Sequence, residues 1–126
     1  MASSSTPISA LPEIRDLLDG AEGQIKADIS RIKKLLADPD AILPLEFVAL
    51  TLQEAKEALG LLVVHSRMLA RWRTDAITDA QRAEVARLQA IVPEIRPLIK
   101  RQIALATELD TRARTGAASP RKVWRH

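Results

Sequence analysis

The sequence predicts an all-α protein, an antiparallel up-down-up bundle of three long helices. Residues that favour helices (Ala, Leu, Ile, Arg and Glu) dominate, whereas aromatic residues make up only 2% of the 126 residues. Apolar residues recur every three or four positions across three long segments, which places them on one side of each helix. Because short loops separate these segments, consecutive helices are expected to be antiparallel neighbours in a single domain.

The first helix is expected to begin within Ser9–Pro12, with a serine cap, and to end by Asp38, because the residue before a proline disfavours helical backbone. Gly20 and Gly23 each weaken it by about 1 kcal/mol relative to Ala, so a break near Gly20 is the alternative. Its apolar residues form one stripe, about 120° wide at 100° per residue. They are Leu11, Ile14, Leu18, Ala21, Ile25, Ile29, Ile32 and Leu36, with Leu17 and Leu35 at the edge.

The second helix, Leu45 to Arg73, carries two apolar stripes that together cover about 220° of its circumference. This is more than the arc of little over 100° that a helix with one buried face needs. One stripe contains Val48, Leu52, Ala55, Leu59, Leu62 and Leu69. The other contains Phe47, Leu50, Ala58, Leu61, Met68 and Trp72.

The third helix is expected to start at Thr78, because Thr78 and Gln81 have the spacing of a capping box. Pro93 and Pro97 would normally interrupt it, but both fall on the face away from its apolar stripe. We therefore expect a kinked helix with an unbroken apolar face, and the alternative is two helices divided near Val92, giving four in all. Gly116 is the expected C-terminal stop.

Most catalytic functions are disfavoured by the residues that the sequence lacks. There is no Cys, no Gly-rich phosphate loop and no pair of residues with the spacing of helical metal ligands. No apolar run reaches the roughly 20 residues that cross a bilayer, and the first residues do not resemble a secretory signal. We expect a cytoplasmic, non-catalytic protein without a cofactor, a metal or a small-molecule substrate.

The excess apolar surface of the second helix indicates an interaction protein, such as an adaptor, a chaperone or an assembly factor. The surplus arc must be covered, either by a second copy or another helical protein, or by the N-terminal segment or the end of the third helix. We favour a partner, in a coiled-coil-like association. The expected contact residues are Phe47, Leu50, Leu61, Val64, Met68 and Trp72.

A polar layer is expected where the second and third helices face each other. His65 and Ser66 fall within the apolar stripes, and a hairpin turning near residue 75 brings Glu84 level with them. Such a layer would fix the register of the two helices. His65 could also act as a pH switch, although an ordinary boundary histidine is the favoured interpretation.

The charge distribution separates a basic tail from the rest of the chain. Residues 1–110 contain all sixteen acidic residues and fourteen of the nineteen basic ones, a net charge of −2. We expect a disordered N-terminus (1–9), a helical domain (10–115) and a flexible basic tail (116–126). The alternative function is therefore accessory binding of nucleic acid or an anionic membrane through that tail. Its expected contact residues are Arg121, Lys122, Trp124 and Arg125.

Overall fold

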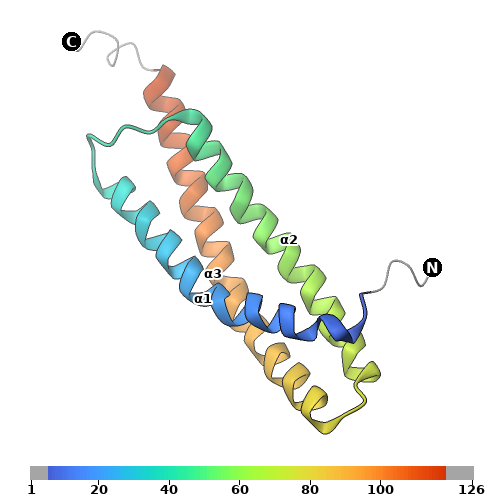
Figure 1. Ribbon diagram of the computed structural model, residues 1–126. Helices are drawn as coiled ribbons and strands as arrows, with labels where there is room; N and C mark the ends of the chain where they lie inside the picture. The colour runs from blue at the N-terminus through green and yellow to red at the C-terminus, as the bar shows by residue number, and fades with distance from the viewer. Residues whose placement is uncertain (1–5, 119–126) are drawn as a thin grey trace.

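The computed structural model describes residues 6–118, which form a short 3-10 helix and three long α-helices. No strand occurs in this part of the chain, so the predicted all-α class is confirmed. Figure 1 shows that α2 runs back from the end at which α1 finishes, and that α3 then returns in the direction of α1. The elements are η2 (Ile8–Ala10), α1 (Leu11–Ala37), α2 (Leu45–Asp75) and α3 (Asp79–Ala118).

Packing is centred on α3. Both α1 and α2 pack along it over much of their length, whereas α1 and α2 make few close backbone approaches to each other. In Figure 1 the N-terminal turns of α1 cross toward the end of α2, and the rest of α1 runs apart from it. One side of the molecule, between α1 and α2, is consequently not closed by helix-to-helix packing.

The predicted capping box at the start of α3 is confirmed. The Gln81 backbone N–H donates to Thr78 Oγ1 at 3.1 Å, and the Thr78 N–H donates to Gln81 Oε1 at 3.1 Å. The serine cap expected on α1 is wrong: its N-cap residue is Ala10, which makes no side-chain cap bond, because η2 runs directly into the helix. Gly20 does not interrupt α1, which is continuous.

α3 is a single helix of 40 residues with Pro93 and Pro97 inside it, so the alternative of two helices divided near Val92 is wrong. Both prolines are exposed. Water can therefore satisfy the carbonyls that lose their partners, which explains how one helix tolerates two prolines. The helix continues to Ala118, the last residue that the structure describes, so the stop expected at Gly116 is wrong.

The buried apolar residues form two clusters rather than one. The larger joins α1, the C-terminal half of α2 and the N-terminal half of α3, and includes Leu62, Leu69 and Ile99. The smaller lies at the other end, around Ile32, Val48 and Leu109. On α3 the two clusters are separated by Gln102, a buried polar residue that is only 6% exposed.

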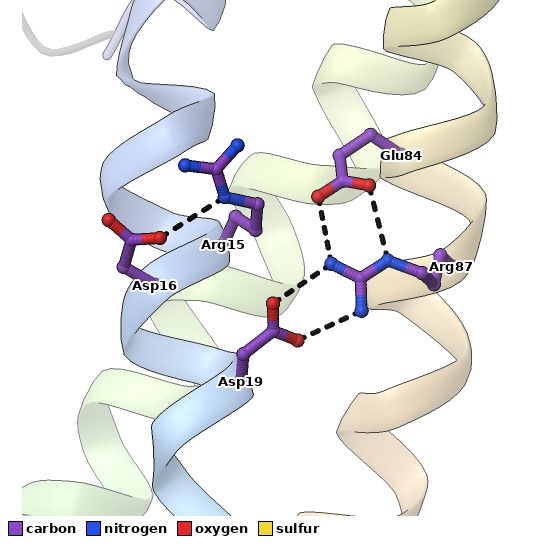
Figure 2. A network of polar contacts seen from close by, with 5 residues as sticks. All are labelled: Arg15, Asp16, Asp19, Glu84 and Arg87. Carbon is purple, nitrogen blue, oxygen red and sulfur yellow. Dashed lines mark hydrogen bonds and ion pairs between the residues drawn. The ribbon is translucent and has the colours of Figure 1, made fainter.

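Two contacts tie α3 to α1 at opposite ends. Figure 2 shows Arg87 of α3 between two carboxylates. It donates to both oxygens of Asp19 on α1, at 2.9 and 3.0 Å, and also to Glu84 one turn away. Near the other end, the Arg112 guanidinium donates to the backbone carbonyls of Leu35, Leu36 and Asp38, and thus caps the C-terminus of α1.

Candidate functional site

The open side between α1 and α2 is a groove of about 510 Å³. Its two walls are the facing sides of α1 and α2, and its floor is α3. The α1 wall contains Leu17, Ala21, Gln24, Asp28, Arg31 and Leu35. The α2 wall contains Phe47, Thr51, Glu54, Ala58, Leu61 and His65. Ile95, Ile99, Gln102 and Leu109 form the floor, and Leu18, Ile25, Ile32 and Leu62 lie where the walls meet it.

Each wall follows one straight line along its helix. The six residues named on each helix are separated by alternating steps of four and three positions, the spacing that keeps side chains on one face toward a neighbouring helix. From Leu17 to Leu35 the line is about 27 Å long at 1.5 Å per residue. The groove therefore has the length of about five helical turns.

The ends of the groove are apolar and accessible. Leu17, Phe47 and Leu61 are 58%, 51% and 56% exposed, although all three line the groove. Because these side chains are half-exposed although they line the groove, the groove is open to solvent and is not a closed cavity. Apolar side chains in such an arrangement gain free energy when a partner covers them, at about 25 cal/mol per Å².

The middle of the groove is polar. Gln102 on the floor donates to Asp28 Oδ2 at 3.4 Å, and Asp28 Oδ1 accepts from Gln24 at 3.1 Å and from Arg31 at 2.9 Å. Across the groove, Glu54 makes no hydrogen bond or ion pair with any residue between 6 and 118. Two carboxylates thus share the centre, and the side chain of Arg31 compensates one of them.

The structure divides the six predicted contact residues. Phe47 and Leu61 line the groove, and Leu50 and Val64 are 53% and 48% exposed on α2 just outside it. Met68 is partly buried against the larger apolar cluster. The prediction that Trp72 contacts a partner is wrong.

Trp72 is fully buried in the larger cluster, with an exposed fraction of 0%. Its indole Nε1 donates to the carbonyl oxygen of Thr6 at 3.0 Å, so the chain at Thr6 lies against the end of α2. Folding back of the N-terminal segment, one of the alternatives from the sequence, therefore covers this end of the second stripe. It leaves Phe47, Leu50 and Leu61 of that stripe about half-exposed.

The polar layer expected among His65, Ser66 and Glu84 is not formed. Glu84 instead accepts from Arg87, and the hydrogen bonds from Arg87 lower the pKa of the Glu84 and Asp19 carboxyls. The physical reason is Arg87, one turn away on α3, which donates to Glu84 and to Asp19 of α1 at the same time (Figure 2). His65 lies on the groove wall, and burial lowers the pKa of its imidazole. The polar layer found instead joins Asp28 to Gln102.

The contribution of α1 to the groove was not predicted. The sequence showed Leu17 and Leu35 only as the edge of the buried stripe, and Asp28 as a polar residue within it. A second line with steps of four and three can be traced from Leu17 to Leu35, but only half of its residues are apolar. The wall line of α2 is apolar at only half of its residues too, but further apolar residues of that helix, such as Leu50 and Val64, lie beside it and mark that face in the sequence.

Other classes of site receive no support from the described part of the chain. Between residues 6 and 118 there is no group of three or more His, Asp or Glu residues arranged to hold a metal ion. None of the helices there has both the length and the hydropathy of a membrane span. The proposed tail residues Arg121, Lys122, Trp124 and Arg125 lie outside the described residues.

Comparisons with known proteins assign no family. No protein-family model matches the chain, and neither the curated proteins nor the solved structures provide a match. The function must therefore be argued from the groove and its surroundings.

Proposed function

We propose that this protein is a non-catalytic helical interaction module, an adaptor, chaperone or assembly factor, that associates through the exposed apolar face of α2. The observation that carries the proposal is the exposure of Phe47, Leu50, Leu61 and Val64 after α1, α3 and the N-terminal segment have packed. In this proposal the molecule is an antiparallel up-down-up bundle in which α3 bends at Pro93 and Pro97. The bundle presents an incompletely covered helix to a second copy or to another helical protein in the cytoplasm.

The exposed face has the composition of an interface rather than of an ordinary surface. Aromatic and large apolar side chains are enriched at interface centres, and contiguous exposed apolar surface on a monomer marks an association site. All four residues named above lie within about five helical turns of one another on one side of α2. A partner that covered them would bury them without rearranging the core.

Size-exclusion chromatography with light scattering, combined with affinity capture, tests the proposal. Leu61→Glu should abolish association because it places a charge on the apolar face, yet it should keep the helical circular dichroism of the wild type. Ile77→Glu is the matched control, since Ile77 is 79% exposed in the loop between α2 and α3. A wild type that is monomeric and captures no partner would contradict the proposal.

Binding of nucleic acid or anionic membranes through the basic tail is the second candidate. Five basic residues and no acidic one follow Asp110, but two of them take part in the fold. Arg112 caps α1, and Arg114 pairs with Asp110 at 2.9 Å. Only three basic residues remain beyond Ala118, and a few charges give weak, salt-sensitive attachment. Deletion of residues 119–126 should abolish such binding while leaving association through α2 intact.

A further inference from the structure

We propose that the groove between α1 and α2 receives one amphipathic α-helix of a partner protein, with large apolar residues at both ends and a single Arg or Lys at its centre. This inference rests on the proposed function and specifies the partner of the same surface. Three features of the groove support it: the arrangement of the three helices, the spacing of the walls and the charge at the centre.

The arrangement of the helices leaves one position of a four-helix bundle unfilled. In such a bundle every helix packs against two neighbours around a common core. Here α1 and α2 both pack on α3 but hardly on each other, so they occupy the positions on either side of it. The unfilled position lies opposite α3, between α1 and α2, and coincides with the groove.

The walls are shaped for a helix. Both wall lines advance by alternating steps of four and three residues, so each wall presents a straight row of side chains to whatever lies between them. An occupant about 27 Å long matches the rows over about 18 residues. A small apolar molecule matches less well, because small-molecule sites bury most of their ligand, whereas Leu17, Phe47 and Leu61 remain about half-exposed.

The charge pattern specifies the occupant. α1 and α2 run in opposite directions (Figure 1), so Leu17 and His65 mark the same end of the groove. Counted from that end, Asp28 is the fourth residue of the α1 wall and Glu54 is the fourth residue of the α2 wall. The two carboxylates therefore lie at the same level, near the middle of the groove. Arg31 is the one Arg or Lys on the walls, so Asp28 and Glu54 give the centre a net negative charge. A cation on the occupant would pair with Glu54, while its apolar ends would cover Phe47 and Leu61.

The same pattern disfavours a second copy of this chain. Its most exposed apolar line runs along α2 through Phe47, Leu50, Leu61 and Val64, and that line carries Glu54 and Glu57 at its centre. Placing it in the groove would set carboxylates against carboxylates, which is destabilising. The occupant is therefore expected to come from a different protein.

Two synthetic helical peptides of 19 residues provide the probe. Both carry Leu at the four-and-three positions facing the groove, and they differ only at the central position, which is Arg in one and Glu in the other. Their affinities for the full chain are measured by fluorescence anisotropy. Wild type should bind the Arg peptide about tenfold more tightly than the Glu peptide, and Glu54→Lys should reverse that preference.

Variants of the chain locate the binding site. Ala58→Arg should abolish binding of the Arg peptide, because Ala58 lines the wall of the groove. Leu61→Lys should do the same and serves as a second variant, since Leu61 is 56% exposed and is not needed in the core. Ala70→Arg is the matched control on the same helix, because Ala70 is exposed, does not line the groove and has no part in the proposed apolar face; it should bind the peptide as wild type does.

Equal binding of the two peptides, or loss of binding in Ala70→Arg but not in Ala58→Arg, would overturn the inference. Two other results would overturn it as well. In the first, the wild type binds an apolar dye but neither peptide, and Ala58→Arg loses the dye. In the second, the chain forms a homodimer that dissociates only when groove residues are substituted. If association depends on Leu50 and Val64 and not on the groove, the helix inference fails and the proposed function stands. If no exposed apolar residue of α2 affects any association, the proposed function fails as well.

Discussion

Replacement of Trp72 by Ala decides whether this residue belongs to the core or to a binding surface. In the structure its side chain is completely buried, and its indole N–H is hydrogen-bonded to the carbonyl oxygen of Thr6. Trp72→Ala would therefore remove the largest fully buried side chain and one contact that holds the N-terminal segment over α2. Stability should fall, and the association proposed for α2 should be affected only through that loss.

The expected cost follows from the burial. Truncation of a fully buried Trp to Ala costs about 3–5 kcal/mol, and the lost hydrogen bond accounts for about 1 kcal/mol of it. We take about 4 kcal/mol. At about 2.1 cal/mol/K of unfolding entropy per residue, a chain of this length would lose about 15 °C in Tm. Leu50→Ala is the control, because Leu50 is 53% exposed on the same helix and should cost less than about 1 kcal/mol.

Urea unfolding followed by helical circular dichroism measures both variants, and light scattering on the same samples reports association. A Trp72→Ala variant that stays within about 1 kcal/mol of wild type in stability, and weakens association instead, would contradict a core role for Trp72. That result would place Trp72 at an interface, as the sequence suggested.

Single substitutions at Gly23, Arg112 and His65 should each change the stability of the bundle in a measurable way. Gly23→Ala should raise the free energy of unfolding by about 1 kcal/mol, because a Cβ at Gly23 meets nothing within 4 Å and Ala favours helix; no change in the urea midpoint would refute this. Arg112→Met should lower the free energy of unfolding by about 2 kcal/mol, because it removes the cap on the C-terminus of α1. Arg114→Met is the more exposed control, and equal effects of the two substitutions would contradict the capping role of Arg112. Because burial lowers the pKa of folded His65 below 6.5, the unfolded chain binds more protons, so stability should fall as the pH drops through and below about 6.5. His65→Gln should flatten that slope, whereas an unchanged pH profile between about pH 5 and 7 would exclude a role for His65.

The acidic limit of stability has a separate origin. Hydrogen bonds from Arg87 hold the pKa values of the Asp19 and Glu84 carboxyls below their ordinary values. The two carboxylates therefore stabilise the fold fully at pH values above their ordinary pKa, and this stabilisation is lost as the pH falls through their lowered pKa values in the folded chain. This window lies below the histidine window. The two contributions can therefore be distinguished in one pH titration of stability.

The groove explains why one helix carries two apolar stripes. The first stripe of α2, including Val48, Leu62 and Leu69, is buried as its spacing predicted. The second lies toward α1, but α1 packs on α3 instead and leaves Phe47 and Leu61 half-exposed. Exposed apolar side chains are thus a consequence of helix arrangement and not of a defect in the core.

Local interactions are the part of this protein that the sequence alone determined. The all-α class, the ends of the loops, the capping box of Thr78 and Gln81, and the buried stripes depend on residues within a few positions of one another. Spacing and capping chemistry are therefore sufficient to predict them. The continuity of α1 through Gly20 and of α3 through Pro93 was less certain from the sequence, because packing against other helices can outweigh local propensity.

Tertiary structure decided what covers each face. Whether Trp72 meets solvent depends on Thr6, 66 residues away, and the bridge from Glu84 through Arg87 to Asp19 of α1 depends on the rotation of α3. The pairing of Asp28 with Gln102 and the gap between α1 and α2 depend in the same way on how separate helices pack. The spacing within one helix defines its faces but not the neighbour of each face, because the neighbour is set by packing between residues distant in the chain.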